Sequence, residues 1–487
     1  MNSEIRNLEP KTVWNNFADL NAVPRPSKKE ERVISFMVEF GKNLNLETII
    51  DKVGNVIIKK PATVGMERKK TVVLQSHLDM VHQKNSNTEF DFDNQGIEMY
   101  VDGDWVTAKG TTLGADNGLG VAAIMSVLKS STIEHPNIEA LFTIDEETGM
   151  TGAMGLEAGY LEGDILLNLD TEEDDEIGMG CAGGIDVTAK RNYVEENTPE
   201  NTLAYTIKIS GLAGGHSGMD IHKGLGNANK IMNRLLLDGF ENFGLRISDI
   251  LGGSLRNAIP RESKATIVID AISKEPFFFE MNELINNIYT EYKSLEKDLS
   301  IEITETETPK YIMELGVQEG FLRSIQTALN GVYRMSPDIK GLVETSNNIA
   351  KVIVKNGSIQ VNCLTRSSSE TNKIDLANSL RAAFELSGFD VEYSGSYPGW
   401  LPNIDSEILK TLDNLYEKLH GEKAKIAACH AGLECGILGQ NYPNMDMVSF
   451  GPTILGAHSP DERASISSTQ KFWTFLLEIL KNIPNKA

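Results

Sequence analysis

The sequence predicts an α/β protein in which a mixed central sheet, flanked by helices, is interrupted by an inserted α+β domain. Three observations predict this class. In the N-terminal third, short apolar runs rich in β-branched residues alternate with segments of helical periodicity. The middle of the chain instead carries longer strand-like runs with amphipathic segments between them. Helical periodicity then returns in the last part of the chain.

The N-terminal third supplies the elements of the first sheet. Ser27 and Glu30 have the spacing of a capping box, and apolar residues then recur at helical spacing as far as Leu44. A second helix, packed through an apolar face, is predicted over 114–128. Strands are predicted at 48–50, 55–58, 71–74, 140–144 and 165–169. The last two strands end in acidic residues, and chemistry in such sheets gathers beyond the strand ends.

The middle of the chain reads as two successive rounds of strands and helices, near 200–272 and 275–392. Strands are predicted there at 203–210, 265–269, 350–354 and 358–364, and helices at 226–237, 278–295, 320–329 and 375–386. Two further helices are predicted at 406–419 and 472–483. We therefore expect one domain in two segments, 1–185 and 394–487, interrupted by a second domain at 186–393.

Composition excludes several classes of protein. The 487 residues carry 46 Lys and Arg against 69 Asp and Glu, a formal net charge of −23, which should repel nucleic acid and anionic membrane surfaces. No apolar run approaches the ~18 residues that span a bilayer. The first residues lack the basic and apolar blocks of a signal peptide, and four cysteines are too few for a disulfide scaffold. We expect a cytoplasmic protein without nucleic-acid or membrane partners.

Polar residues with the chemistry of a metal site follow the predicted strands. Asp79 is two residues from His77, so in an extended chain its carboxylate would lie beside the imidazole and fix its tautomer. Asp116 lies at a predicted helix start, where a simple N-terminal cap is the alternative. Glu146 and Glu147 would point to opposite sides of an extended segment, so that one could bind a metal and the other transfer protons.

Two more candidates complete the set. Asp170 ends the apolar strand ILLNLD, and His458 lies in the loop GAHSPDE, where a lone histidine is usually an ordinary surface residue. Taken together, two histidines, two aspartates and a glutamate form an oxygen- and nitrogen-rich site for divalent cations. One carboxylate can bridge two such ions at about 3.5–4 Å. A solvated acidic turn remains the alternative for residues 145–147.

Five motifs occur in the order and context of a known family. They are HLD at 77–79, GADNG at 114–118, DEETG at 145–149, LNLD at 167–170 and GAHSPDE at 456–462. Together they resemble the di-zinc metallopeptidase family of carboxypeptidase G, peptidase T and carnosinase, and GLAGGHSGMDI is similar to the lid signature of that family. Within the family, three segments are most similar to bacterial cytosolic aminoacyl-histidine (Xaa-His) dipeptidases: TTLGADNGLG, DEETGMTGA and GLAGGHSGMDIHKGLGNANK.

The resemblance implies two Zn²⁺ per subunit, for which Mn²⁺ or Co²⁺ could substitute. It implies these roles: His77 and Asp170 bind one ion, Glu147 and His458 bind the other, Asp116 bridges both, Asp79 orients His77, and Glu146 is the general base. It also implies a cis peptide bond after Asp116 and an oxyanion donor at His216, often from the partner subunit. The implied reaction is hydrolysis of Xaa-His, carnosine-like dipeptides by a water between the ions.

Substrate contacts are implied by the same resemblance. Asn257 and Arg366 resemble positions that contact the substrate backbone and terminal carboxylate, with Arg256 competing for the second role. Gly432 resembles part of a Gly-rich active-site loop, although its neighbours Ala431 and Leu433 depart from the carnosinase version. A homodimer through the inserted lid domain is expected.

Other functions remain open. An N-acyl amino acid deacylase or a broader dipeptidase could use the same scaffold. A two-metal phosphoesterase would need more Lys and Arg near the ligands, and a binding protein that had lost activity would not need Glu146. A thiol protease is disfavoured because Cys429 and His430 are adjacent, and adjacent side chains rarely form a nucleophile–base pair.

Overall fold

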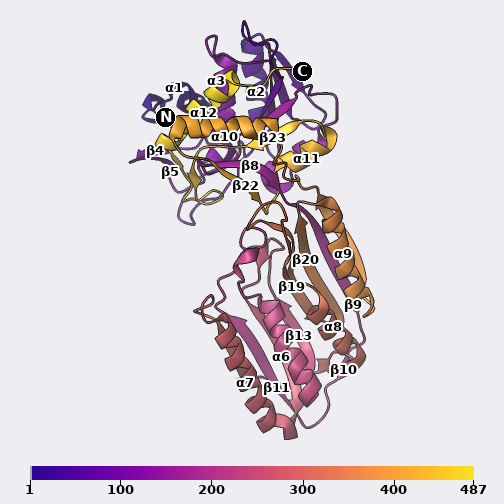
Figure 1. Ribbon diagram of the computed structural model, residues 1–487. Coiled ribbons are helices and arrows are strands. Elements are labelled where there is room, and N and C mark those ends of the chain that lie inside the picture. Colours follow the sequence, from indigo (N-terminus) through magenta and orange to yellow (C-terminus); the bar gives the residue numbers. More distant parts are fainter. Residues whose placement is uncertain (1–2, 487) are drawn as a thin grey trace. The chain divides into compact units, whose positions relative to one another are not determined.

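A computed structural model describes residues 3–486, which divide into two compact units (Figure 1). Unit 1 comprises the chain up to Gly180, Trp400–Ala428 and the chain from Leu433 onward. Unit 2 comprises Cys181–Gly399 and Cys429–Gly432. We expected the inserted domain at 186–393, and unit 2 extends slightly beyond that range at both ends.

Unit 1 is built on an eight-stranded mixed sheet. Its strands stand in the order β1 (Glu47–Ile50), β2 (Val56–Lys60), β6 (Ile138–Thr143), β3 (Val72–His77), β7 (Ile165–Asn168), β23 (Asp446–Ser449), β8 (Glu176–Cys181) and β22 (Lys425–Cys429). Strands β6, β3, β7 and β23 are parallel neighbours. Strands β3, β6 and β7 are buried along their whole length, which explains why they read in the sequence as nearly continuous apolar runs.

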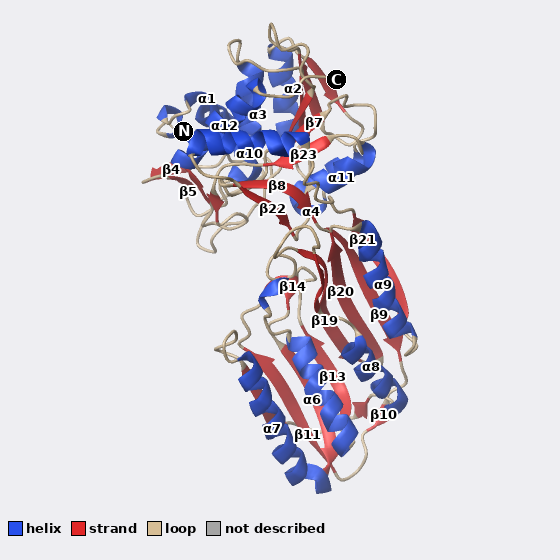
Figure 2. Ribbon diagram, viewed as in Figure 1, coloured by secondary structure: helices blue, strands red, loops and turns tan. Residues whose placement is uncertain are grey.

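Helices flank this sheet (Figure 2). They are α1 (Lys11–Leu20), α2 (Glu31–Asn43), α3 (Ala115–Lys129), α4 (Glu146–Gly149), α5 (Thr151–Gly155), α10 (Glu407–His420), α11 (Glu434–Asn441) and α12 (Ile466–Lys481). The hydroxyl of Ser406 caps α10 by accepting the N–H of Leu409, and Ser465 caps α12 in the same way through Ser468. A second, four-stranded sheet has the order β24 (Ile454–Leu455), β25 (Arg463–Ser465), β5 (Trp105–Ala108) and β4 (Met99–Asp102).

Unit 2 is built on a nine-stranded antiparallel sheet. Eight strands follow the order β16 (Ser300–Glu305), β11 (Thr202–Ser210), β15 (Ser263–Asp270), β13 (Arg246–Gly252), β19 (Val343–Lys355), β20 (Ser358–Ser367), β9 (Gly183–Asn192) and β21 (Asp390–Tyr397), and β18 (Gly331–Met335) pairs with β19. Both expected rounds of strands and helices enter this one sheet, and they meet where β13 pairs with β19. They do not correspond to its two halves, because β16 of the second round pairs with β11 of the first.

Four helices lie along one face of this sheet, as Figure 2 shows. They are α6 (Ala228–Phe243), α7 (Lys274–Tyr292), α8 (Leu315–Thr327) and α9 (Glu370–Glu385). The core of the unit lies between helices and sheet and includes the fully buried side chains of Ile207, Leu235 and Phe321. Two short pairs complete the unit: β10 (Glu196–Asn197) with β17 (Tyr311–Ile312), and β12 (Gly215–His216) with β14 (Ala258–Ile259).

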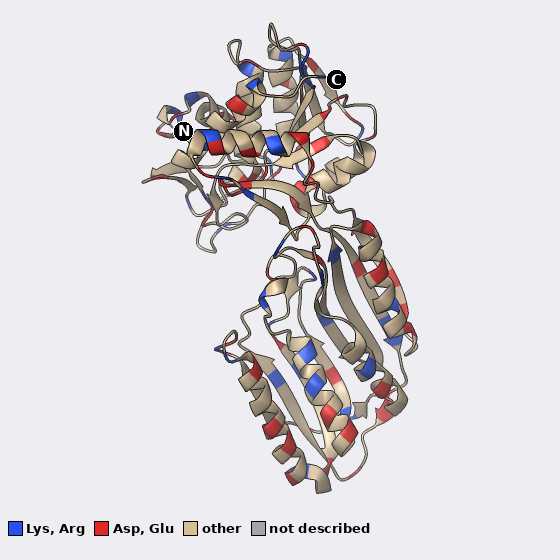
Figure 3. Ribbon diagram, in the orientation of Figure 1, with Lys and Arg blue, Asp and Glu red and all other residues tan. Residues whose placement is uncertain are grey.

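The predicted α/β class with a mixed, helix-flanked sheet is confirmed. Acidic and basic side chains are interspersed over both units (Figure 3), so the net charge of −23 does not come from one acidic segment. Within residues 3–486, every helix is too short or too polar to cross a membrane.

Candidate active site

The candidate ligands meet at the carboxyl ends of the central parallel strands of unit 1. His77 is the last residue of β3, and Asp170 follows β7 by two residues. Glu146 and Glu147 follow β6, which is the neighbour of β3 on the other side. Because parallel strands end at the same edge of a sheet, residues far apart in the sequence come together there.

Glu146 and Glu147 do not form the extended segment that the sequence predicted. They open the single-turn helix α4, directly after Asp145, whose φ is 52°. The cause is Asp79, whose carboxylate accepts the N–H groups of Glu146 at 3.0 Å and Glu147 at 3.3 Å. A carboxylate that accepts these N–H groups favours the start of a helix, so the chain turns here. The alternation expected of the two side chains is therefore wrong.

Asp116 is not an ordinary helix cap. Helix α3 starts at Ala115, but the backbone is non-helical at Asp116 and Asn117, and the peptide bond between them is cis, as the resemblance implied. The two carboxylate oxygens of Asp116 instead contact two histidines. Oδ1 lies 3.2 Å from Nε2 of His77, and Oδ2 lies 3.1 Å from Nε2 of His458. The capping interpretation is wrong, and the arrangement suits a bridging carboxylate.

The structure gathers the five candidate ligands into two groups that share Asp116. In the first group, His77 Nε2 lies 3.5 Å from Asp170 Oδ1. In the second, His458 Nε2 lies 2.9 Å from Glu147 Oε2. Within each group the three ligand atoms all lie within 4.8 Å of one another. By the same criterion His77 also forms a group with Glu146 and Glu147.

Electrostatics in the cluster show an excess of buried negative charge. Burial raises the pKa values of Glu146, Glu147 and Asp170. Hydrogen bonds with Asp116 and Glu147 raise the pKa of His458 to about 11. Burial opposes protonation of His77, yet Asp170 and the other carboxylates around it raise its pKa well above the ordinary value.

The donor atoms fit divalent cations. Glu147 Oε1 and Asp170 Oδ1 are buried and have no hydrogen-bond partner, which is costly for a carboxylate unless a cation contacts it. Imidazole nitrogens together with carboxylate oxygens are suitable ligands for Zn²⁺ and for related first-row ions. These residues could therefore hold a pair of ions.

The carboxylate of Asp79 lies beside the His77 ring. Its Oδ1 lies 3.3 Å from Nδ1 of His77, which leaves Nε2 directed at the ligand cluster. Oδ2 of the same carboxylate accepts the hydroxyl of Ser27 at 2.8 Å. Ser27 is therefore not the start of a capping box. Helix α2 begins at Glu31, and the Glu30 carboxylate accepts the N–H of Lys28 instead.

Glu434 is a site-adjacent residue that the sequence reasoning missed. Its side chain is fully buried, and Oε2 accepts hydrogen bonds from Gln75 Nε2 and Thr143 Oγ1, both at 2.6 Å. Burial raises its pKa to about 8. Its signal in the sequence is its place in the segment CHAGLECG, two residues after Gly432.

Unit 2 holds a second polar group around His216. Nδ1 of His216 accepts the N–H groups of Gly218 at 3.2 Å and Met219 at 3.0 Å, so the ring proton of the neutral imidazole lies on Nε2. Burial and the charge of Arg366 lower the pKa of His216 to about 4. Nη2 of Arg366 lies 3.5 Å from Nε2. Two donors that face each other in this way are suited to share an anionic oxygen.

The two candidate arginines have different surroundings. Arg256 forms an ion pair with Asp186 at 3.1 Å and donates to Thr188 and to the Cys363 carbonyl. The guanidinium of Arg366 instead donates from Nη1 to the hydroxyl of Tyr397 at 2.8 Å. Arg256 is therefore occupied within the sheet, whereas Arg366 keeps Nη2 beside His216. Tyr397 was not singled out from the sequence.

The remaining candidates also lie in unit 2. Asn257 is exposed, and its carbonyl accepts the N–H of Ser217, so it lies next to His216 in the fold. Gly432 belongs to the short segment that contains His430, whose Nε2 lies 2.7 Å from Ser346 Oγ. Ser346 pairs with Arg366 across β19 and β20.

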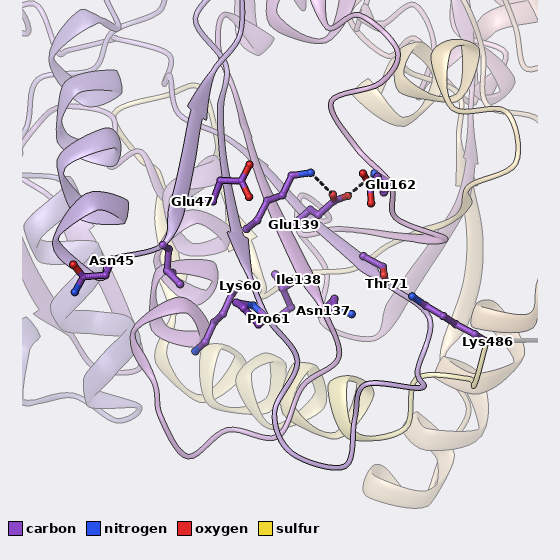
Figure 4. A pocket seen from close by; sticks show the side chains of 12 residues that line it. Asn45, Glu47, Lys60, Pro61, Thr71, Asn137, Ile138, Glu139, Glu162 and Lys486 are labelled. Atoms are coloured by element: carbon purple, nitrogen blue, oxygen red, sulfur yellow. Dashed lines mark hydrogen bonds and ion pairs between the residues drawn. The ribbon is translucent and has the colours of Figure 1, made fainter.

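A hollow at the opposite edge of the unit 1 sheet is not a comparable site. It has a volume of about 440 Å³ and lies where β3 and β6 begin (Figure 4). Lys59 forms an ion pair with Glu139 at 3.0 Å, and Glu139 also accepts the N–H of Glu162. Lys60 donates to three carbonyls that include those of residues 127 and 128. These charges are occupied in holding the fold together.

Comparison with known proteins gives consistent results. Residues 73–482 match the sequence model of peptidase family M20/M25/M40. The chain is 43% identical over 484 residues to the cytosol non-specific dipeptidase of Escherichia coli (strain K12), covering 99% of this chain and 100% of that protein. The crystal structure of aminoacylhistidine dipeptidase from Vibrio alginolyticus has a TM-score of 0.93 at 45% identity, covering 100% of this chain and 99% of that one. A Bacillus cereus aminopeptidase PepT structure, with a TM-score of 0.58 at 16% identity over 98% of this chain and 99% of that one, supports the fold alone.

Proposed function

This chain belongs to the M20/M25/M40 family of peptidases, and from that premise we propose that it is a metal-dependent dipeptidase that hydrolyses Xaa-His dipeptides. The observation that carries the proposal is the pair of ligand groups that share Asp116. The names of the two similar proteins support a dipeptide substrate. The aminoacylhistidine dipeptidase favours Xaa-His, whereas the non-specific dipeptidase favours a broader specificity.

We propose that the ions are two Zn²⁺, with Mn²⁺ or Co²⁺ as possible substitutes. His77 and Asp170 would hold one, Glu147 and His458 would hold the other, and Asp116 would contact both. When bound, the ions would supply positive charge that polarises the scissile carbonyl and lowers the pKa of a water molecule.

Glu146 is the proposed general base. It accepts a proton from the attacking water and delivers that proton to the leaving amine. Burial, which raises its pKa, supports this role because a carboxylate of higher proton affinity accepts a proton more readily near neutral pH. Asp79 keeps the His77 ring in place while this happens.

The proposed substrate contacts lie in unit 2. His216 would donate a hydrogen bond from Nε2–H to the developing oxyanion, which its neutral state and the two N–H groups on Nδ1 support. Arg366 would bind the carboxylate of the substrate, because its planar fork can donate two hydrogen bonds. Asn257 and Gly432 would contact the substrate backbone.

The deciding experiment is hydrolysis of a panel of Xaa-His and Xaa-Gly dipeptides, with and without a chelator. We expect cleavage of free dipeptides, loss of activity with chelator and recovery on adding Zn²⁺. Activity on acetyl- or succinyl-amino acids but not on free dipeptides would overturn the proposal in favour of a deacylase. Equal rates on Xaa-His and Xaa-Gly would leave a dipeptidase of broad specificity.

We also propose that the chain is cytoplasmic and forms a homodimer through unit 2. The name of the similar cytosol dipeptidase supports the location. On unit 2, Leu251 and Leu255 are 60% and 65% exposed, and this apolar surface supports a contact between copies. Light scattering on the purified protein would measure the mass, and a monomer at micromolar concentration would contradict the dimer.

A further inference from the structure

Glu462 accepts hydrogen bonds from consecutive backbone N–H groups of the loop that leads into Asp116. Oε2 accepts the N–H of Leu113 at 2.7 Å and of Gly114 at 3.0 Å, while Oε1 accepts that of Ala115 at 2.7 Å. A fourth, longer contact of 3.4 Å reaches the N–H of Asp116 itself. The Glu462 side chain is 2% exposed, so the loop is held from inside the protein.

The N–H groups of Ala115 and Asp116 belong to the first turn of helix α3, where such groups have no intrahelical partners, and those of Leu113 and Gly114 directly precede it. A side chain at the helix start normally accepts them, but Gly114 has none and Asp116 directs both carboxylate oxygens at His77 and His458. Glu462 thus takes the place of the missing cap from the other end of the chain. The Asp116 carboxylate is thereby left for the ligand cluster.

Arg25 holds the opposite side of the same loop. Its Nη2 donates to the Gly114 carbonyl, and its Nη1 donates to the carbonyls of Leu78 and Asp79, both at 3.0 Å. The side chain is 1% exposed. One buried guanidinium therefore ties the loop of Asp116 to the loop that follows His77.

The glycines of the GADNG motif leave room for this arginine. A Cβ atom at Gly114 or at Gly118 would lie 2.6 Å from Nη2 of Arg25, closer than a non-bonded contact allows. Gly114 also has a φ of 70°, which favours glycine. The two glycines of the motif are therefore required by the space that Arg25 occupies, in addition to any requirement set by Asp116 between them.

We propose that Glu462 and Arg25 are positioning residues that set the place of the bridging ligand Asp116 relative to His77 and His458. The proposal rests on the metal centre of the proposed function. Neither side chain would contact the metal ions or the substrate. Their effect would pass through the backbone of residues 113–116 and 78–79, and it would concern both ions because Asp116 contacts both histidines.

The test compares Glu462→Gln with Asp461→Asn, which makes the same change of charge on the exposed neighbouring residue. Glutamine keeps the shape of Glu462 but turns one acceptor into a donor that faces backbone N–H groups. We expect Glu462→Gln to lower the affinity for Zn²⁺ alone by about 10- to 100-fold for both ions, measured by chelator competition without substrate. Asp461→Asn should stay within about twofold of the parent chain.

Calorimetry of the metal-free proteins measures their unfolding temperatures, so that a loss of Zn²⁺ affinity can be distinguished from a general loss of stability. Unchanged Zn²⁺ affinity in Glu462→Gln, whatever its unfolding temperature, would overturn the proposal. If that variant is not recovered folded, Arg25→Lys provides the same test, because lysine keeps the charge but cannot reach the three carbonyls at once. Zn²⁺ binding is measured without a peptide. The affinities for Zn²⁺ therefore test the proposal even if the protein proves not to be a dipeptidase.

Discussion

At the scale of single residues, the cluster shows how one carboxylate can do several tasks. Asp79 orients His77, accepts the hydroxyl of Ser27 and starts the helical turn that carries Glu146. Asp116 can contact two histidines because Glu462, rather than Asp116, accepts the backbone N–H groups at the start of helix α3. Removing such a residue would therefore disturb more than one neighbour, whereas Glu146 can be tested alone.

Glu146→Gln should lower kcat by about 10²- to 10⁴-fold and leave the Zn²⁺ content of the protein unchanged. Glutamine cannot accept the proton, but it keeps the size of the side chain. Steady-state kinetics and elemental analysis of the same preparation check both statements. Activity within tenfold of the parent chain would remove Glu146 from the role of general base.

Tyr397→Phe should raise KM about tenfold with kcat within twofold, because Arg366 loses the hydroxyl that holds Nη1. Tyr393→Phe in the same strand is the matched control, since its hydroxyl donates to Asn378 on the exposed surface. A fall in kcat with KM unchanged would contradict a binding role for Arg366.

At the scale of elements, the ends of four neighbouring strands are linked by buried polar side chains. Gln75 of β3 donates to Thr143 of β6 and accepts from Asn168 of β7, which in turn accepts from Ser449 of β23. In this polar row, Gln75, Thr143 and Asn168 come shortly before His77, Glu146 and Asp170 in the sequence. Each strand end is therefore held in register with its neighbour where a ligand follows.

Asn168→Leu should destabilise unit 1 by about 1–3 kcal/mol, because Gln75 Oε1 would be left buried without a partner and the hydroxyl of Ser449 would keep only Thr171. The control Asn87→Leu makes the same change at an exposed position of unit 1. Urea unfolding measures both. A loss below about 0.5 kcal/mol for Asn168→Leu would show that the polar row does not support the strand ends.

The sequence predicted the strands that carry the ligands, because strands buried on both faces read as apolar runs. The predictions of helix caps failed where a residue distant in the sequence formed the hydrogen bonds that the local pattern would have supplied. The capping patterns at Ser27 and at Asp116 are genuine in sequence, but Asp79 and Glu462 take over those contacts in the fold. Arg25 gave no signal, since a single arginine in a polar loop resembles a surface residue.

At the scale of the whole molecule, one buried histidine of unit 2 and one buried glutamate of unit 1 have opposite effects on stability in acid. Burial and nearby Arg366 lower the pKa of His430 to about 3, while burial raises that of Glu434 in unit 1 to about 8. A histidine of lowered pKa stabilises the fold fully above the unfolded value of about 6.5 and loses that stabilisation as the pH falls below it. A carboxyl of raised pKa has the opposite effect.

His430→Gln should therefore reduce the pH dependence of stability. Between pH 6.5 and 5 the native chain should lose about 2 kcal/mol through His430, at ~1.4 kcal/mol per pH unit. The variant should lack this loss. Urea unfolding at pH 7 and pH 5 measures the difference between the two proteins, and an identical pH dependence would contradict the buried neutral state of His430.

The ligands are distributed unevenly along the chain. His77, Asp116, Glu147 and Asp170 all lie within the first 170 residues, whereas the ligand His458 and the positioning residue Glu462 follow some three hundred residues later. During synthesis on the ribosome, the first group of ligands can thus emerge long before the second can form. A nascent chain without that last segment would lack β23, His458 and the Glu462 carboxylate that holds the Asp116 loop, so neither group would be complete until the segment had folded back. Catalytic competence would then report that translation of both segments of unit 1 is complete.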